Sequence, residues 1–476
     1  MSRPHWHFVT GKLAADSLAN LLKELAPQAN FDYSLQVLPV KVAALMTADW
    51  VAPRLELSAN VTHLMLPGRC RGSLSTLEEQ LKIPVVRGPG DYRDLPEYFG
   101  KKSERLKHYG PYDIEILAEI NHAASWTIPE ILKQAKRWRA EGANLIDVGC
   151  DPGVTWAGVG EVVQALRDDG HRVSVDSLNP QEIELATQAG AELVLSVNSS
   201  NREFAQDWEV EVVAIPDSPE DWKSLEETVD YLETKKILHR IDPILEPIGF
   251  GFAESLIRYQ KARKQWPETD IMMGIGNLSE LSEVDSSGVN FLLLGICQEW
   301  QIDSILTTEV INWARSSVKE CDIARRMVYY AIHHQNLPKH LTAELLLLRD
   351  AKQRELSTEE INKLAEQITD KNFRLFLSQG LLYVINSEMN LSHEDPFELF
   401  EQVLKKTKVT IDAGHAFYLG YEMAKAVTAR TLGKSYSQDQ ALTWGFLTEE
   451  EQSFLEKKRQ EKIEQRAIKK QKKRPL

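Results

Sequence analysis

Between Asp113 and Val310, short apolar segments alternate with amphipathic stretches of helical periodicity, and the alternation occurs eight times. Strict alternation of strands and helices predicts parallel strands joined by helical crossovers, and eight such units close into a barrel. The sequence therefore predicts an α/β fold, a central (β/α)8 TIM barrel whose functional residues follow the strands. The predicted strand segments are Asp113–Asn121, Asn144–Cys150, Arg172–Ser177, Leu193–Asn198, Glu211–Ser218, Ile237–Leu245, Ile271–Leu278 and Ser304–Val310.

The pattern differs on either side of this barrel. Before it, the apolar segments HFVTG, SLQVLPV, THLMLPG and IPVVRG, each close to a Gly or Pro, predict a small doubly wound α/β domain. After it, helices are predicted at Thr342–Asp350, Ser357–Gln367, Pro396–Lys405 and Ala416–Leu432, with strands at FRLFLS, LLYVINS and KVTIDA. The predicted domains are 1–105 (N-terminal α/β), 111–335 (barrel), 340–450 (C-terminal α+β) and 456–476 (a basic tail).

Length and composition agree with several domains. The chain has 476 residues, and a typical barrel has about 250. No apolar run of about 18 residues is present to span a membrane, and the N-terminus has no secretory pattern, so we expect a cytoplasmic protein. Its four cysteines show no paired spacing, which argues against disulfides or structural zinc, and we predict no metal-ligating set.

Charge is unevenly distributed. The net charge is −14, but the segment from Glu456 onward carries ten Lys or Arg and three Glu, a local +7 that leaves −21 on the rest. The acidic body makes nucleic-acid binding unlikely as the main function. The tail is either a solvated segment or an arm for RNA, acidic lipid or a partner.

Two smaller features have both a structural and a functional interpretation. Four arginines lie near predicted strand ends of the N-terminal domain: Arg69, Arg71, Arg87 and Arg93. We expect them to be solvated surface residues. His415 lies at a predicted turn between a strand and a helix, where it either caps the helix or contacts a ligand.

The candidate chemistry lies at the predicted barrel strand ends, which carry Asp147, Asp176, Asn198 and Asn277. A carboxylate at the end of a buried strand must be paired or hydrogen-bonded, because its desolvation costs several kcal/mol or more. A group of carboxylates and amides suits a flat heterocycle with alternating donors and acceptors. The alternative is that these residues cap the helices that follow each strand.

Several of these segments resemble a known family. GANLIDVGCDPG, VSVDS and LVLSVN resemble, in order and spacing, successive motifs of the pterin-binding barrels, which include dihydropteroate synthases and methyltetrahydrofolate–corrinoid methyltransferases. LAEINHAAS resembles the first strand of the family, with Asn121 at its polar end. ILHRIDPILEPIGFGF resembles the strand with the pterin-binding carboxylate, which makes Asp242 the counterpart and Glu246 an alternative. The whole chain is similar to dihydropteroate synthase-related proteins.

The resemblance implies roles for individual residues. It implies that the pterin is bound by Asn121, Asp176, Asn198, Asp242 and Asn277. Asn277, Asp147 and Glu119 are the candidate catalytic residues, with Glu309 as a further acid–base candidate. A reduced pterin or folate is the expected substrate; no covalently bound cofactor is expected, and Mg²⁺ stays open.

The chain also departs from the synthase pattern. Where synthases carry Ser-Arg-Lys and Arg-x-His, it has Gly276-Asn277-Leu278-Ser279 and Leu306-Thr307-Thr308-Glu309, so a leaving pyrophosphate would lack cationic stabilisation. GIGNLS instead resembles a methyltransferase motif. We therefore expect a transferase of pterin, folate or one-carbon metabolism. A methyltransferase working with a separate corrinoid protein, a non-catalytic pterin sensor or scaffold, and an unrelated barrel enzyme for a phosphorylated substrate are the alternatives. A homo-oligomer also stays open.

Overall fold

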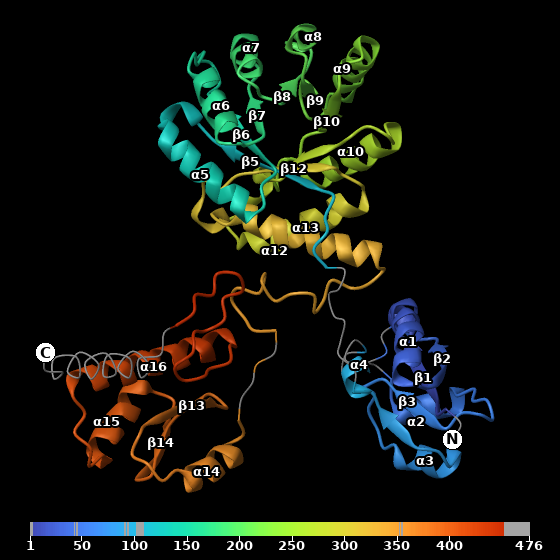
Figure 1. The fold of residues 1–476 in the computed structure, drawn as a ribbon, viewed down its shortest axis with the longest axis vertical. Helices are drawn as coiled ribbons and strands as arrows, with labels where there is room; N and C mark the ends of the chain where they lie inside the picture. The colour runs from blue at the N-terminus through green and yellow to red at the C-terminus, as the bar shows by residue number, and fades with distance from the viewer. Residues whose placement is uncertain are drawn as a thin grey trace, which may run out of the picture. The chain divides into compact units, whose positions relative to one another are not determined.

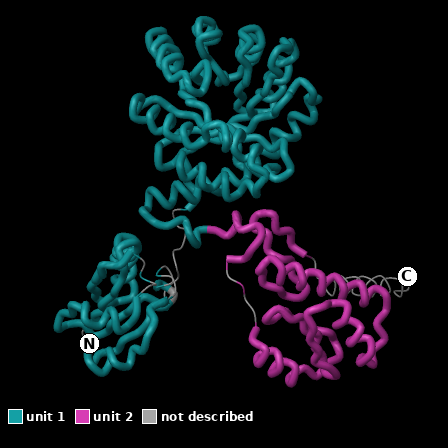
Figure 2. The backbone as a smooth tube through the Cα atoms, turned by 180° about the vertical axis from the view of Figure 1, so that it is seen from behind, with its two compact units in different colours: residues 1–341 teal, residues 342–476 magenta. Residues whose placement is uncertain are grey.

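The computed structural model describes residues 3–451 except 42, 44–45, 90–91, 93–94, 101–108, 352 and 354–355. The chain forms two compact units, residues 1–341 and 342–476 (Figure 2). The predicted basic tail, Arg93 and most of the segment between the first two predicted domains lie outside the described residues.

Eight parallel strands form the centre of the first unit, with helices arranged around them (Figure 1). The strand order is β10-β9-β8-β7-β6-β5-β12-β11, and a parallel bridge between Ile241 and Ile271 joins the two ends of this sheet. The predicted TIM barrel is confirmed. Its strands are β5 Glu115–Ile120, β6 Leu145–Gly149, β7 Val173–Asp176, β8 Leu193–Val197, β9 Glu211–Ala214, β10 His239–Ile241, β11 Met272–Gly274 and β12 Ser304–Thr307.

The barrel helices follow from local sequence signals. In the helix after β5, Thr127 and Glu130 form a capping box, Ile131, Ala135 and Trp138 form the buried face, and Gly142 at φ 118° ends it. The barrel helices are α5 Ile128–Glu141, α6 Val159–Asp168, α7 Pro180–Gln188, α8 Ala205–Trp208, α9 Trp222–Lys235, α10 Phe252–Gln265, α11 Gly276–Ser279, α12 Ser286–Glu299 and α13 Ser317–His333, with short 3-10 turns at Ala123–Ser125, Arg202–Phe204 and Asn312–Ala314.

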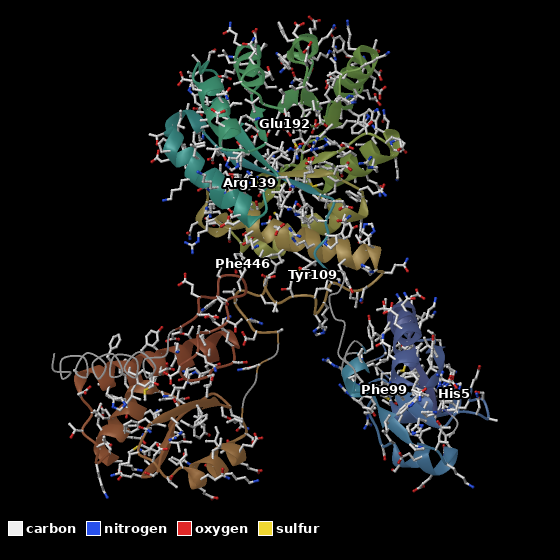
Figure 3. The ribbon with its side chains drawn as sticks, viewed as in Figure 1. His5, Phe99, Tyr109, Arg139, Glu192 and Phe446 are labelled. Carbon is white, nitrogen blue, oxygen red and sulfur yellow. The ribbon has the colours of Figure 1, made fainter. Side chains whose placement is uncertain are left out.

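Ion pairs connect the amino ends of the barrel strands. Arg240 on β10 is 6% exposed and lies 3.0 Å from both Glu115 and Glu211, measured between nitrogen and oxygen. Arg172, just before β7, pairs with Glu115 at 2.7 Å and with Glu192 at 2.5 Å; Glu192 is labelled in Figure 3. The two guanidinium groups therefore balance carboxylates from several strands at this end of the barrel.

A parallel sheet of order β2-β1-β3-β4 forms the N-terminal part of the first unit. Leu64 and Leu66 pack into the core on one face of it, and Phe8 and Met65 pack with Leu22 of the first helix on the other. The predicted doubly wound pattern is therefore seen. Its elements are β1 His5–Gly11, α1 Ala15–Ala29, β2 Asp32–Leu38, α2 Ala48–Val51, β3 His63–Leu66, α3 Ser75–Leu81, β4 Val85–Arg87 and α4 Leu95–Tyr98, with 3-10 turns at Lys12–Ala14 and Ala52–Arg54.

The second unit is an antiparallel three-stranded sheet with helices. Its elements are α14 Thr358–Gln367, β13 Arg374–Ser378, β14 Leu381–Asn386, β15 Met389–His393, α15 Pro396–Lys406 and α16 Ala413–Leu432. Two predictions were wrong here: KVTIDA forms no strand, and Thr342–Asp350 forms turns. In KVTIDA the backbone N–H of Val409 donates to the Thr407 hydroxyl, and Asp412 caps α16 through the N–H of His415. His415 thus lies in the first turn of α16, beside the ring of Phe373.

Two further expectations concern the whole chain. The four cysteines are unpaired, and Cys70, Cys297 and Cys321 are buried. Among the described residues, no helix is both long and apolar enough to cross a membrane.

Replacing Arg240 with Met should destabilise the barrel. The substitution keeps an apolar stem but leaves Glu115 and Glu211 without this buried partner, and breaking a buried ion pair costs about 3–5 kcal/mol. We expect a fall in the free energy of unfolding of about that size, measured by urea denaturation with hydrogen exchange of barrel peptides. Arg139→Met on exposed α5 is the control and should change it by less than about 1 kcal/mol. Equal effects of the two substitutions would contradict the proposed role of Arg240.

Candidate functional site

Three carboxylates on neighbouring strands meet within the barrel. Glu119 on β5 lies opposite Asp147 on β6, and Gly149 on β6 lies opposite Asp176, the last residue of β7. One oxygen each from Glu119, Asp147 and Asp176 lies within 4.8 Å of the other two. We call these three residues and Asp242 the acidic cluster, because the charge of Asp242 acts on Asp176.

Asp147 lies deeper in the barrel than the sequence predicted. The prediction placed it at a strand end, but β6 continues to Gly149, so Asp147 is fully buried. Ser174 donates a hydrogen bond of 2.6 Å to its Oδ1, whereas its Oδ2 has no partner among the described residues. Burial and the charges of Asp176 and Glu119 raise the pKa of Asp147 well above its usual value. The carboxyl group therefore needs a proton or a ligand.

Asp176 and Asp242 are the carboxylates nearest to the strand ends. Burial and the charge of Asp242 raise the pKa of Asp176 to about 7. Asp242, the residue after β10, accepts hydrogen bonds at Oδ1 from the Tyr259 hydroxyl at 2.5 Å and the Ile244 N–H at 2.8 Å. Burial still raises the pKa of Asp242 to about 6. Both groups titrate close to neutral pH.

The pKa of Glu119 is also raised above its usual value. Burial and the charges of Asp176 and Glu280 raise it to about 8, so Glu119 holds a proton at pH 7. Gly149 makes room for this side chain, since a Cβ there would lie 2.8 Å from Glu119 Oε1. Glu280 was missed by the sequence analysis; it directly follows α11, and only its place one helical turn after Gly276 could have indicated it.

The three asparagines are placed differently from one another. Asn121 accepts a hydrogen bond of 2.7 Å from the Thr308 hydroxyl. The side-chain oxygen of Asn198 accepts from the N–H and hydroxyl of Ser200, a local turn contact, while Asn201 is the residue that precedes the next helical turn. Asn277 is exposed, lies in α11 and not on a strand, and donates to the Leu245 carbonyl at 3.1 Å. Their assignment to pterin binding stays a prediction.

Two acidic candidates are occupied by structural contacts. The Glu309 side chain is 1% exposed, pairs with Arg137 and accepts hydrogen bonds from Trp138 Nε1 at 2.7 Å and the Val318 N–H at 3.1 Å. Glu246, the alternative to Asp242, pairs with Arg258 at 2.7 Å. Asp242 is therefore the better placed of the two carboxylates, and Glu309 is held in the wall of the barrel.

The loops after the strands carry exposed apolar side chains that the sequence analysis also missed. Each is at least 47% exposed, and together they come from six of the eight connections that follow barrel strands. They are Val154, Leu178, Phe204, Ile248, Phe250, Leu281 and Val310, which we call the apolar rim. No periodic signal marks such residues, because they are spread over six different loops.

The cluster has three chemical options for neutralisation. It can hold protons, accept N–H groups of a ligand, or bind a divalent cation, since Mg²⁺ prefers oxygen ligands, commonly carboxylates and water. The sequence predicted no metal-ligating set and left Mg²⁺ open; the convergence of Glu119, Asp147 and Asp176 shows which residues could supply the oxygens. A flat heterocycle with adjacent N–H donors matches Asp176, a partly open carboxyl group that ionises near neutral pH.

Two family models match separate parts of the chain. A family model described as "Pterin binding enzyme" matches residues 122–236, and one described as a family of unknown function matches residues 4–90. An uncharacterized protein of Methanocaldococcus jannaschii is 26% identical and covers 90% of this chain and 97% of its own length.

Solved structures with similarity to the chain include dihydropteroate synthases. That of Yersinia pestis, solved with a pterin–sulfa conjugate, is 18% identical, covers 46% of this chain and 94% of its own, and has a TM-score of 0.38. That of Anaplasma phagocytophilum is 18% identical, covers 46% and 98%, and has a TM-score of 0.37. Within the central barrel, residues 122–236 are therefore similar to the family of pterin-binding enzymes.

Proposed function

We propose that the acidic cluster binds the ring of a reduced pterin or folate, and that the barrel transfers a group carried by that ring. The observation that carries the proposal is the convergence of Glu119, Asp147 and Asp176 within 4.8 Å of one another, beside Asp242. Buried like charges raise one another's pKa, and this arrangement is favourable only when something neutralises it. A pterin ring offers several N–H donors on one edge.

In this proposal each group has a distinct task. Asp176 and Asp242 accept hydrogen bonds from ring N–H and amino groups, and Asn198 uses its amide nitrogen, because its oxygen is engaged with Ser200. Asp147 lies beside Asp176 and Glu119, is held by the Ser174 hydrogen bond, and raises the pKa of a neighbouring carboxyl group when it is ionised. Asn121 and Asn277 stay candidates at the edge of the site.

Glu119 suits the role of proton donor. When a methyl group leaves a ring nitrogen for a nucleophilic acceptor, the bonding electron pair stays on the nitrogen, which must then gain a proton. Since burial and Asp176 raise the pKa of Glu119 to about 8, it is protonated at pH 7 and can supply that proton. Synthase chemistry has less support, because Glu309 and Thr308 occupy a position where synthases carry cationic residues.

The apolar rim favours one particular candidate, a methyltransferase that works with a separate corrinoid protein. Exposed apolar side chains on six loops around one end of a barrel are unusual on a surface that contacts only water. An acceptor delivered by a second protein would cover them while its reactive group reaches the cluster. A non-catalytic pterin sensor is the alternative from another class, and only turnover separates it from an enzyme.

Asp176→Asn should weaken pterin binding by about tenfold to a hundredfold, because a charge-assisted hydrogen bond contributes about 1.5–3 kcal/mol. We would titrate the protein by calorimetry with 6-hydroxymethyl-7,8-dihydropterin, its pyrophosphate and 5-methyltetrahydrofolate, with Mg²⁺ and with EDTA. Asp207→Asn on exposed α8 is the control and should bind like wild type. Wild-type affinity in Asp176→Asn would exclude this carboxylate as a pterin ligand.

Pterin affinity should depend on pH with a defined sign. Ring N–H groups bind the ionised form of Asp176, whose raised pKa of about 7 means that protons compete with the ligand below that pH. The dissociation constant should therefore rise about tenfold for each pH unit below 7 and stay constant above about 8. Calorimetric titrations between pH 5.5 and 9 measure this, and Asp176→Asn should lose the step near pH 7. Affinity that is constant over this range would contradict binding by ionised Asp176.

Glu119→Gln should reduce turnover by about a hundredfold or more while leaving pterin affinity nearly unchanged, because Gln resembles the protonated carboxyl but cannot release a proton. Two assays are needed: 5-methyltetrahydrofolate with cob(I)alamin, and 6-hydroxymethyl-7,8-dihydropterin pyrophosphate with 4-aminobenzoate. Wild-type turnover should decline above pH 8 as Glu119 ionises. Glu254→Gln on exposed α10 is the control. Binding without turnover in both assays would support the sensor.

A further inference from the structure

The topology of the N-terminal sheet creates a natural place for a ligand. From β1 the chain passes through α1 to β2 on one side, and from β2 it crosses to β3 on the other side of β1. The loops after β1 and β3 therefore leave neighbouring strand ends in opposite directions. In open parallel sheets, ligands bind in the crevice at the carboxyl ends of two such strands. This domain, in which His5 and Phe99 are labelled in Figure 3, matches a family of unknown function.

A pocket of about 210 Å³ lies at this point. Its lining includes Phe8, Val9 and Thr10 at the end of β1, Leu66 at the end of β3, and residues of the loops that follow β3 and β4. The segment after α13, which belongs to the same unit, completes the wall. From the loops come Pro67, Gly68, Arg69, Gly88 and Pro89, and from the later segment Asn336, Leu337, Lys339 and His340.

The pocket has an apolar floor and few polar groups. Phe8, Leu18, Met65 and Leu95 are each at most 5% exposed and pack against one another in one core. Thr10, at the end of β1, is 3% exposed and lies among these apolar residues. Its hydroxyl group can both donate and accept a hydrogen bond, so it offers a polar contact to a ligand atom.

Basic side chains occur among the described residues that line this pocket. Arg69 is exposed and forms no ion pair within the described part of the chain. Lys339 and His340 also line the pocket, and no described lining residue is acidic, although the chain has 70 Asp and Glu against 56 Lys and Arg. Of the arginines near these strand ends, Arg87 instead donates to the carbonyls of Cys70 and Gly72 and holds the loop after β3.

The wall of the pocket is built by close backbone contact. A Cβ atom at Gly68 would lie 2.1 Å from the carbonyl oxygen of Pro89, so only glycine allows the loops after β3 and β4 to touch here. A Cβ at Gly88 would lie 3.0 Å from the sulfur of Met65. These contacts fix two sides of the pocket before any ligand binds, which lowers the entropic cost of binding.

We propose that the N-terminal domain binds a small anionic ligand with a flat apolar ring at this pocket. The ring lies on the floor formed by Phe8, Leu18 and Met65, the Thr10 hydroxyl bonds to a polar atom of the ligand, and Arg69 pairs with its carboxylate or phosphate. A volume near 210 Å³ suits one or two rings, since drug-sized ligands occupy about 300 Å³ or more. The inference does not rest on the proposed function of the barrel.

Full-length protein can be tested with benzoate and phenyl phosphate as anionic probes and benzyl alcohol as a neutral probe of similar shape. Ligand-observed NMR and calorimetry should show that at least one anion binds about tenfold or more tightly than the alcohol. Arg69→Gln should reduce anion affinity to that of the alcohol, and Thr10→Val should weaken binding while keeping the packing. Arg71→Gln, an exposed arginine outside the lining, is the control and should bind like wild type.

Because Arg69 and Arg71 are both exposed, these two variants should fold like wild type, which circular dichroism can verify. Anion binding that Arg69→Gln reduces and Arg71→Gln does not would establish the site and separate it from any binding in the barrel. Equal binding of benzyl alcohol and the anions, or anion binding unaffected by Arg69→Gln, would overturn the proposal. No binding of any probe at millimolar concentration would show that the pocket is a packing crevice and would equally overturn it.

Discussion

Like charge inside a closed barrel is the constraint on which the rest of this structure depends. The register of the parallel strands places Glu119, Asp147 and Asp176 on three neighbouring strands. Because these strands are hydrogen-bonded to one another, the backbone positions of the three residues stay close together. Ionising all three at once would oppose folding, so their pKa values are raised, and they need protons or a ligand. At the amino ends of the strands, Arg240 and Arg172 balance Glu115 and its neighbours. The barrel therefore separates its charges: neutralised pairs stabilise one end, and carboxylates remain available near the other.

The sequence predicted the barrel well because its signals are local and repeated. Eight apolar segments at regular spacing, each followed by an amphipathic helix, leave few other topologies. Asp176 could be placed at a strand end for the same reason, whereas Asp242 was predicted from the family resemblance alone. The state of each side chain could not be predicted, because it depends on partners distant in sequence. Glu309 pairs with Arg137, which lies about 170 residues earlier in the chain. Glu280 affects the acidic cluster because its charge raises the pKa of Glu119 on β5.

Two errors of the sequence analysis have different physical origins. The side-chain oxygen of Asp412 accepts a hydrogen bond from a backbone N–H three residues later, and this local bond competes with strand formation. At Asp412 it starts α16, and the residues before it form no strand although KVTIDA alternates like one. The sequence analysis placed Asp147 at the end of its strand, although β6 continues to Gly149. The alternation of strand residues shows which face a side chain lies on, but not the position at which the strand ends.

The protonation of the cluster also explains how such a costly arrangement can be useful. A group whose pKa is about 7 gives up its proton at pH 7 at almost no cost in free energy, since each pKa unit is worth about 1.4 kcal/mol. Had burial raised the pKa of Asp176 by several more units, a ligand would first have to remove a tightly held proton. Had a lysine neutralised Asp176, the ligand would have to break an ion pair. A carboxylate poised near neutrality avoids both costs, while Glu119, with its higher pKa, keeps a proton in the same site.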